Sequence, residues 1–143
     1  MRFLIVEDNR AMCTAIANMI EQLPGPEPIE IDETYCATMA IELIHGNTYD
    51  LILLDITLGN RNGLSVLAQI KSFRPRQAVL IVSMHLEEVF APICLRMGAA
   101  GYLEKRYAMG ELPVAINTIM SGGTYTSPRI SAQSEALYYG HAS

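Results

Sequence analysis

The sequence predicts an α/β domain built on a doubly wound parallel sheet. Three observations lead to this fold class. Five short apolar runs alternate along the chain with five segments in which apolar residues recur at helical spacing. Most of these runs are almost continuously apolar, which is typical of strands buried on both faces. The length of 143 residues, half of them apolar, suits one domain with a single core.

The apolar runs and the helical patterns place ten elements along the chain. We expect strands at residues 3–6, 29–32, 51–54, 78–82 and 101–103. We expect helices at residues 10–23, 36–45, 64–73, 87–97 and 111–120. Gly46 and Gly98 stand where the second and fourth helices would end. Crossovers between the parallel strands should be right-handed.

Two prolines lie inside predicted helices and limit where those helices can begin. Pro92 leaves two alternatives: the fourth helix starts late, near residue 91, or it is kinked at the proline. Pro113 is acceptable only if it falls within the first turn of the last helix.

Composition excludes several classes of protein. A net charge of −5 argues against nucleic-acid binding by the surface of this domain. Cys13, Cys36 and Cys94 are widely spaced, so we expect reduced, mostly buried thiols in a cytoplasmic protein. The sequence has no uninterrupted apolar run of about 18 residues and no signal-peptide pattern, so we expect no membrane association.

Polar side chains follow four of the five predicted strands, where ligands bind in open parallel sheets. Glu7 and Asp8 follow the first strand, Asp55 the third, Ser83 the fourth and Lys105 the fifth. Each residue alone has an ordinary explanation, since acids are favourable at helix starts and serine is common in turns. Their combination on one rim indicates a functional site.

Three close carboxylates favour a hard cation, because without one their pKa values should rise. Mg²⁺ takes one or two protein carboxylates together with water and phosphate oxygens. Lys105 and Ser83 would add a positive charge and a hydrogen-bond donor for a phosphoryl group. In this interpretation Asp55 is the nucleophile and forms an acyl phosphate.

The same residues carry a family resemblance over about residues 1–120. Four segments together resemble the receiver domain of two-component response regulators: "FLIVEDN", "DLILLDITL…NG", "VLIVSMH" and "GAAGYLEK". The resemblance implies a flavodoxin-like (βα)5 fold with strand order 2-1-3-4-5. It also implies a protein that is not an enzyme on other substrates and catalyses only its own phosphorylation and dephosphorylation.

The resemblance assigns a role to each site residue. Asp55 would accept a phosphoryl group from a sensor histidine kinase, and Ser83 and Lys105 would contact that group. Mg²⁺ would be bound by Glu7, Asp8, Asp55 and the backbone carbonyl of Thr57. Tyr102 matches the switch aromatic, which turns inward when the hydroxyl moves to the phosphate; the alternative is a half-buried strand residue. The surface of residues 87–97, 101–103 and 111–120 would then change shape and favour a homodimer or release a partner domain.

Several positions depart from the family pattern. Gly59 replaces a usual proline, which should loosen the loop after Asp55. Arg106 replaces the proline that often follows the lysine, so a cis bond is not expected there. Met84 is larger than usual and is expected to shade the site in part. Together with Pro92, these departures leave open the shape of the surface that would contact the output. None of them removes a chemical group, so we still expect the domain to be phosphorylated.

The end of the sequence narrows the subfamily. "IMSGGTYTSP" resembles the end of receivers of the NarL/FixJ type, which continue into a LuxR-type helix-turn-helix output domain. We therefore expect a receiver domain over residues 1–121 and a linker or C-terminal tail over residues 122–143. No basic recognition helix follows residue 128, so either this is a receiver cut from a longer regulator or the chain ends here naturally. The resemblance of the linker favours the first alternative, with DNA contacted only through a missing domain.

Two other functions remain as alternatives. The departures at Gly59, Met84 and Pro92 are compatible with a protein-interaction module that does not depend on phosphorylation. A phosphohydrolase with an aspartyl intermediate, resembling haloacid dehalogenases, would need a second acid two residues after Asp55, and that residue is Thr57. A nucleotide-binding domain is disfavoured further, since neither the dinucleotide glycine pattern nor a P-loop is present.

Overall fold

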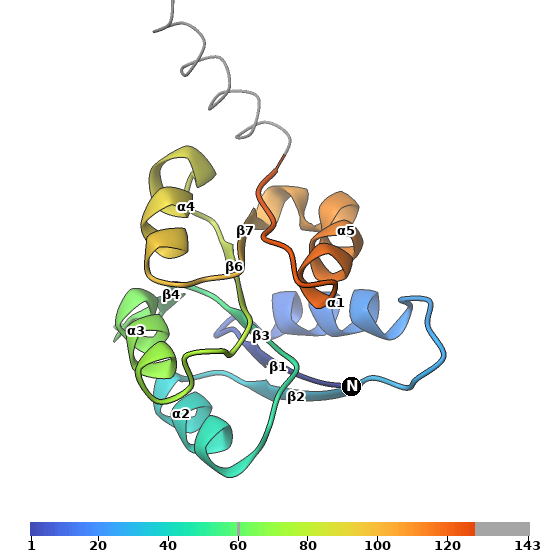
Figure 1. Cartoon of the computed structure of the whole chain (residues 1–143), viewed down its shortest axis with the longest axis horizontal. Helices are drawn as coiled ribbons and strands as arrows, with labels where there is room; N and C mark the ends of the chain where they lie inside the picture. The colour runs from blue at the N-terminus through green and yellow to red at the C-terminus, as the bar shows by residue number, and fades with distance from the viewer. Residues whose placement is uncertain (60, 128–143) are drawn as a thin grey trace, which may run out of the picture.

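The computed structural model describes residues 1–59 and 61–127, which form a three-layer α/β domain (Figure 1). A five-stranded parallel sheet in the order β2-β1-β3-β6-β7 forms the middle layer. Counted along the chain, the strands of this sheet follow the order 2-1-3-4-5. The predicted fold class and strand order are therefore confirmed.

The element bounds lie close to the predicted ones. The sheet consists of β1 (Arg2–Val6), β2 (Glu30–Thr34), β3 (Leu51–Leu54), β6 (Val79–Ser83) and β7 (Gly101–Glu104). The helices are α1 (Arg10–Glu21), α2 (Ala37–Gly46), α3 (Gly63–Phe73), α4 (Glu87–Arg96) and α5 (Ala108–Met120). A short 3₁₀ helix, η1 (Lys105–Tyr107), joins β7 to α5.

Helices cover both faces of the sheet. In Figure 1, α2, α3 and α4 lie on one side and α1 and α5 on the other. Alternate strand residues enter the two cores: Leu4 and Ile52 pack with the first group of helices, Phe3 and Leu51 with the second. Every residue of β3, β6 and β7 is buried, because successive side chains point to opposite faces of the sheet and helices cover both faces.

The register of the parallel strands brings their carboxyl ends to one rim. Val6 of β1 pairs with Leu54 of β3, so the next residues, Glu7 and Asp55, leave the sheet side by side. The Asp55 amide donates to the Val6 carbonyl at 3.0 Å. On the far side of the rim, Ser83 pairs with Glu104, the residue before Lys105.

Both helix prolines lie inside helices. The fourth helix begins at Glu87, so the alternative of a late start near residue 91 is wrong; Pro92 lies within the helix, and the alternative of a kink there stays a prediction. The last helix begins at Ala108, so Pro113 lies beyond the first turn and that expectation is also wrong. The physical reason is η1, which leads directly into α5 and starts the helix three residues earlier than predicted.

A small hairpin that the sequence did not predict follows β3. β4 (Thr57–Leu58) pairs antiparallel with β5 (Arg61–Asn62). Gly63 then starts α3 in close contact with the end of β3, since a Cβ there would lie 2.3 Å from the Ile56 Cα. Only glycine allows this approach, and it explains the glycine of the "NG" pair after Asp55.

The chain continues beyond α5 along the edge of the sheet. Tyr125 forms a parallel bridge with Gly101 of β7. The predicted boundary at residue 121 stays a prediction, and residues 128–143 of the predicted linker or tail lie outside the described residues. Across the described ranges, no helix is both long and apolar enough to cross a membrane.

Candidate functional site

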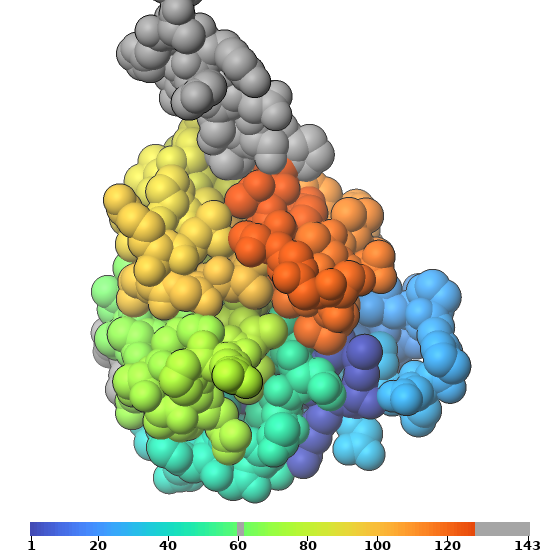
Figure 2. All heavy atoms as spheres, viewed as in Figure 1, coloured from blue at the N-terminus to red at the C-terminus, as the bar shows by residue number. Residues whose placement is uncertain are grey.

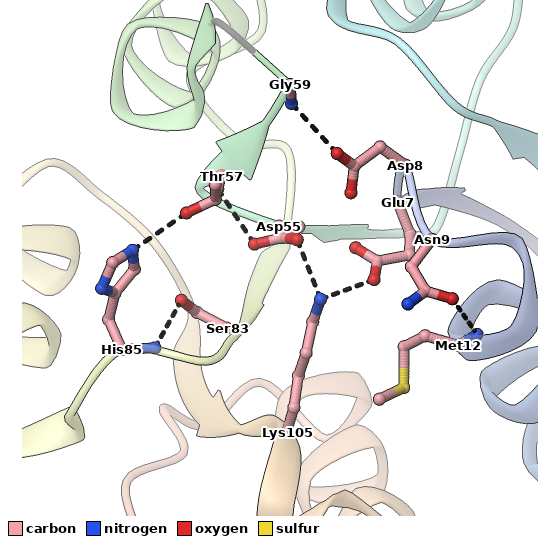
Figure 3. Close-up of polar contacts among 10 residues, drawn as sticks. All are labelled: Glu7, Asp8, Asn9, Met12, Asp55, Thr57, Gly59, Ser83, His85 and Lys105. Atoms are coloured by element: carbon pink, nitrogen blue, oxygen red, sulfur yellow. Dashed lines mark hydrogen bonds and ion pairs between the residues drawn. The ribbon is translucent and has the colours of Figure 1, made fainter.

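Three of the predicted acids meet at the carboxyl rim of the sheet (Figure 3). Glu7, Asp8 and Asp55 each offer one carboxylate oxygen, and these oxygens lie within 4.8 Å of one another. Glu7 and Asp55 are only 2% and 4% exposed, whereas Asp8 is exposed. The spacing allows the three groups to contact one common ion.

Local structure fixes the positions of these acids. Asn9 caps α1 by accepting a hydrogen bond from the Met12 amide at 3.1 Å, so Glu7 and Asp8 are confined between β1 and the helix. Asp55 follows the last residue of β3, and its Oδ1 accepts from the Thr57 amide at 3.0 Å. Burial within the sheet and hydrogen bonds in the loop therefore orient the acids before any ligand binds.

Lys105 lies between two of the acids. Its Nζ donates to Glu7 Oε1 at 2.5 Å and to Asp55 Oδ2 at 2.9 Å. The Lys105 side chain is 8% exposed, so both ion pairs are largely shielded from water. Figure 3 shows Lys105 reaching from the end of β7 toward the ends of β1 and β3.

The charges within this cluster do not balance. Burial, and after it the adjacent Asp55, raise the pKa of Glu7 to about 8, although Lys105 acts in the opposite direction. Burial lowers the pKa of Lys105, but its hydrogen bonds to Glu7 and Asp55 outweigh burial and the pKa is raised. One ammonium thus faces two buried carboxylates, and the excess negative charge favours a proton or a cation.

A buried oxygen of Glu7 supports a cation more directly. Among residues 1–59 and 61–127, Glu7 Oε2 is buried without a hydrogen-bond partner. A buried carboxylate oxygen without a partner is costly, so it indicates that a further group contacts it. The all-oxygen donor set of Glu7, Asp8 and Asp55 suits a hard divalent cation. The residues present therefore fit a Mg²⁺ site.

The loop after Asp55 closes over the acids through two further contacts. The Gly59 amide donates to Asp8 Oδ2 at 3.0 Å, and the Thr57 hydroxyl lies 2.9 Å from His85 Nε2. Gly59 has a φ of 58°, a value closed to proline, and proline would also lack this amide hydrogen. The glycine at this position therefore adds a contact to the site.

Ser83 and Tyr102 both contact the loop between β6 and α4. Ser83 is fully buried, and its Oγ accepts from the His85 amide at 3.1 Å. Tyr102 is 0% exposed, so this strand residue is fully buried and not half-buried, and its role as the switch aromatic stays a prediction. Its hydroxyl donates to the His85 carbonyl at 2.9 Å. Burial raises the pKa of Tyr102 to about 12, which keeps the phenol protonated as a donor.

Two further residues of this loop lie near the site in sequence. Met84 is 76% exposed, so most of its side chain faces solvent, and the expected partial shading of the site stays a prediction. His85, which sequence reasoning missed, contacts Thr57, Ser83 and Tyr102. The one feature of the sequence that could have indicated His85 was its position two residues after Ser83. A single histidine in a loop forms no recognisable motif, so this position alone did not predict a role. The Lys105–Arg106 peptide bond is trans, as expected.

Comparison with protein families identifies the class of this domain. Residues 3–117 match the family described as response regulator receiver domain. This match covers most of the chain, and the chain belongs to that family.

Individual relatives agree with this assignment and with the NarL/FixJ-type subfamily. The chain is 26% identical to "Response regulator GacA" of Pseudomonas aeruginosa over 92% of its own length and 61% of that protein. It is 31% identical to a "Putative transcriptional regulator" of the same organism, over 85% of its length and 57% of that protein. The chain thus spans about three fifths of the length of these relatives.

A solved structure shares the fold at similar sequence identity. It is a two-component response regulator of the LuxR family from Aurantimonas sp. SI85-9A1, with 27% identity and a TM-score of 0.82. The similarity covers 92% of each chain.

Proposed function

We propose that this receiver domain accepts a phosphoryl group from a sensor histidine kinase on Asp55 and uses it to control an output. The observation that carries the proposal is the buried Asp55 carboxylate, held by Lys105 beside Glu7 and Asp8. The geometry supplies the nucleophile, the positive charge and the oxygen ligands that phosphoryl transfer requires.

The acids would hold Mg²⁺ through Glu7, Asp8, Asp55 and the backbone carbonyl of Thr57. The metal, when bound, would neutralise negative charge on the phosphoryl oxygens. Glu7 Oε2 is available for this role because it has no hydrogen-bond partner within the described part of the chain.

The transfer forms one bond and breaks another. A carboxylate oxygen of Asp55 attacks the phosphorus of the phosphohistidine, and the phosphorus–nitrogen bond breaks. The electron pair of that bond stays on the imidazole nitrogen of the kinase. Lys105 exchanges part of its contact with Asp55 for a phosphoryl oxygen, and the buried position of the ammonium strengthens that interaction.

The phosphoryl group would then shift an equilibrium between two conformations. Ser83 would leave the His85 amide and donate its hydroxyl to a phosphoryl oxygen. Tyr102 already lies inward in this structure, with its hydroxyl on the His85 carbonyl, and the phosphoryl group would raise the population of that position. The surface of α4, β7 and α5 would follow, because Tyr102 packs in the same core as Ala91 and Cys94 of α4.

We further infer that the output is transcriptional and acts in the cytoplasm. The name of one relative, "Putative transcriptional regulator", supports a regulator of transcription. The chain spans only about three fifths of the length of this relative and of "Response regulator GacA". DNA would be bound by a domain outside this chain, and phosphorylation would favour a homodimer of the receiver.

The substitution Asp55→Asn tests the proposal. It removes the nucleophile while keeping the size of the side chain, so labelled phosphoryl uptake from a histidine kinase or from acetyl phosphate should fall below detection. The melting temperature should stay close to that of the wild type. Asp50→Asn, at the opposite end of β3, is the matched control and should leave uptake unchanged.

Uptake by Asp55→Asn at the wild-type rate would remove the assignment of the nucleophile. A wild-type protein that binds neither Mg²⁺ nor beryllofluoride, a mimic of the phosphoryl group, would favour the alternative of a phosphorylation-independent interaction module.

A further inference from the structure

The segment that follows α5 is bound along the edge of the sheet. The Tyr125 amide donates to the Ala100 carbonyl at 2.9 Å, and the Tyr102 amide donates to the Tyr125 carbonyl at 3.2 Å. In Figure 2 the red-orange atoms at the end of the described chain lie beside the yellow atoms of α4 and the orange atoms of α5. Residues 124–127 thus occupy the surface that α4, β7 and α5 form together.

Two carboxylates hold this segment by its side chains. Ser127 donates both its amide, at 3.2 Å, and its hydroxyl to the carboxylate of Glu87. Glu87 is 3% exposed and Ser127 is fully buried, so these are charge-assisted hydrogen bonds shielded from water. The Tyr125 hydroxyl donates to Glu111 Oε1 of α5 at 2.7 Å. We call the contact between Ser127 and Glu87 the clasp.

The clasp matters energetically because Glu87 is a buried acid. A buried carboxylate that loses its donors retains the full cost of its desolvation. Release of the segment therefore removes two donors from this buried carboxylate and favours a movement of Glu87 toward solvent. Since Glu87 is the first residue of α4, such a movement would disturb the start of that helix.

Hydrogen bonds connect the clasp to the candidate switch residues. The Glu87 amide donates to Glu104 Oε1 of β7 at 3.2 Å, which ties the start of α4 to the strand that carries Tyr102. Tyr102 contacts the segment through its backbone amide and the His85 carbonyl through its hydroxyl. Tyr102 thus contacts both residues 124–127 and the loop whose His85 amide binds Ser83.

We propose that residues 124–127 are an output element whose binding to α4 and β7 through the clasp is coupled to the phosphoryl group on Asp55. This inference rests on the proposed function. Tyr102 binds the segment through its amide while its hydroxyl contacts the His85 carbonyl, so the bound segment and the inward Tyr102 occur together in this structure. In the proposed coupling, phosphorylation favours the inward Tyr102 and thereby strengthens binding of residues 124–127.

Coupling of this kind must act in both directions. If the phosphoryl group strengthens the clasp, then loss of the clasp weakens binding of the phosphoryl group or its mimic. This reciprocity separates a coupled element from a segment that only covers an apolar edge, since a passive cover would leave the affinity at Asp55 unchanged.

The experiment is amide hydrogen exchange of the full chain, with and without Mg²⁺ and beryllofluoride. We expect the mimic to slow exchange at Tyr125 and Ser127 by about tenfold, within the usual range of coupling between sites. Ser127→Ala should speed exchange at both amides by about tenfold without the mimic. The same variant should weaken beryllofluoride binding by about fivefold.

Glu87→Gln provides a second variant, which removes the charge from the clasp. Like Ser127→Ala, it should speed amide exchange at Tyr125 and Ser127 and weaken beryllofluoride binding. Ser121→Ala and Glu88→Gln are the matched controls, because both residues are exposed and lie next to the segment and to Glu87 in sequence. Both controls should match the wild type in exchange and in affinity.

The outcomes are distinguishable. If beryllofluoride binds but exchange at residues 124–127 does not change, the inference is wrong and the proposed function stands. If Ser127→Ala binds the mimic as tightly as the wild type, the coupling is likewise excluded. If the wild-type protein does not bind beryllofluoride at all, the proposed function and the inference both fail.

Discussion

The rim of the sheet divides into two halves with different kinds of contact. Beyond the ends of β1 and β3, Glu7 and Asp55 form ion pairs with Lys105, whose side chain reaches them from the end of β7. On the side of β6 and β7, Ser83 and Tyr102 interact with backbone groups of the loop that leads into α4. The acidic half therefore carries the groups for phosphoryl transfer. The other half carries the contacts that can change the backbone of the loop that leads into α4.

The two halves also differ in how completely their polar groups are satisfied. In the acidic half, Glu7 Oε2 is without a partner in the described ranges. In the second half, Glu104 and Glu87 each accept hydrogen bonds from neighbouring elements. A site with an excess of charge is prepared for a ligand, whereas a satisfied network changes only when one of its members is displaced. The side chain of Lys105 belongs to the acidic half, whereas its backbone directly follows β7, a strand of the second half.

Lys105→Ala should give the largest change, because it breaks the acidic half. It leaves Glu7 and Asp55 buried without their cation, and such a loss costs about 3–5 kcal/mol. We expect the free energy of unfolding to fall by about 3 kcal/mol without Mg²⁺, and to recover in part when Mg²⁺ is added. Urea unfolding with and without Mg²⁺ measures both effects.

Lys105→Met keeps much of the side-chain volume and separates the loss of charge from the loss of packing. It should resemble Lys105→Ala in its dependence on Mg²⁺ and should lose dimerisation in response to the phosphate mimic. Normal dimerisation of either variant with beryllofluoride would contradict a role for Lys105 in switching.

Gly63→Ala should have the next largest effect, because it strikes the backbone that supports Asp55. The added Cβ would lie 2.5 Å from the Asp55 carbonyl oxygen and closer still to Ile56, so the start of α3 must move. We expect a destabilisation of about 2–3 kcal/mol, in the range for a forced steric contact in a core, together with weaker binding of Mg²⁺. Thermal unfolding and metal titration would measure the two effects.

Gly110→Ala is the matched control for this substitution. Gly110 lies within α5, and a Cβ added there would meet no neighbouring atom within 4 Å, so alanine should stabilise the helix by about 0.5–1 kcal/mol. If both substitutions changed stability in the same direction and by the same amount, the close approach at Gly63 would not be the cause.

The acidic half could be predicted from the sequence almost completely, and physical reasons explain this. Parallel strands of nearly continuous apolar residues fix where each strand ends, and the next residue must then lie on the rim. Glu7, Asp55 and Lys105 meet for that reason, although the ion pairs of Lys105 with both acids could not be derived from spacing.

The second half was predicted less well, because its contacts depend on backbone groups and on segments distant in sequence. The hydrogen bonds of His85 to Thr57 and Tyr102 follow from the path of a loop, which no periodic pattern determines. Glu87 was part of a predicted helix, but nothing in its local sequence indicated that Ser127, 40 residues away, would be its partner. Pro113 was misplaced because η1 leads directly into α5, so the last helix begins at Ala108.

Tyr102→Phe should have the smallest effect and tests the second half alone. It removes the hydroxyl that donates to the His85 carbonyl but keeps the buried ring, so stability should fall by about 1 kcal/mol. Phosphoryl uptake by Asp55 should remain within about twofold of the wild type, since the acids and Lys105 are untouched. Coupling should weaken instead: beryllofluoride should slow exchange at Tyr125 less than in the wild type.

Tyr35→Phe removes an exposed hydroxyl contact to Glu33 and serves as the control. A Tyr102→Phe protein that lost uptake but kept full coupling would show that the two halves are not separable.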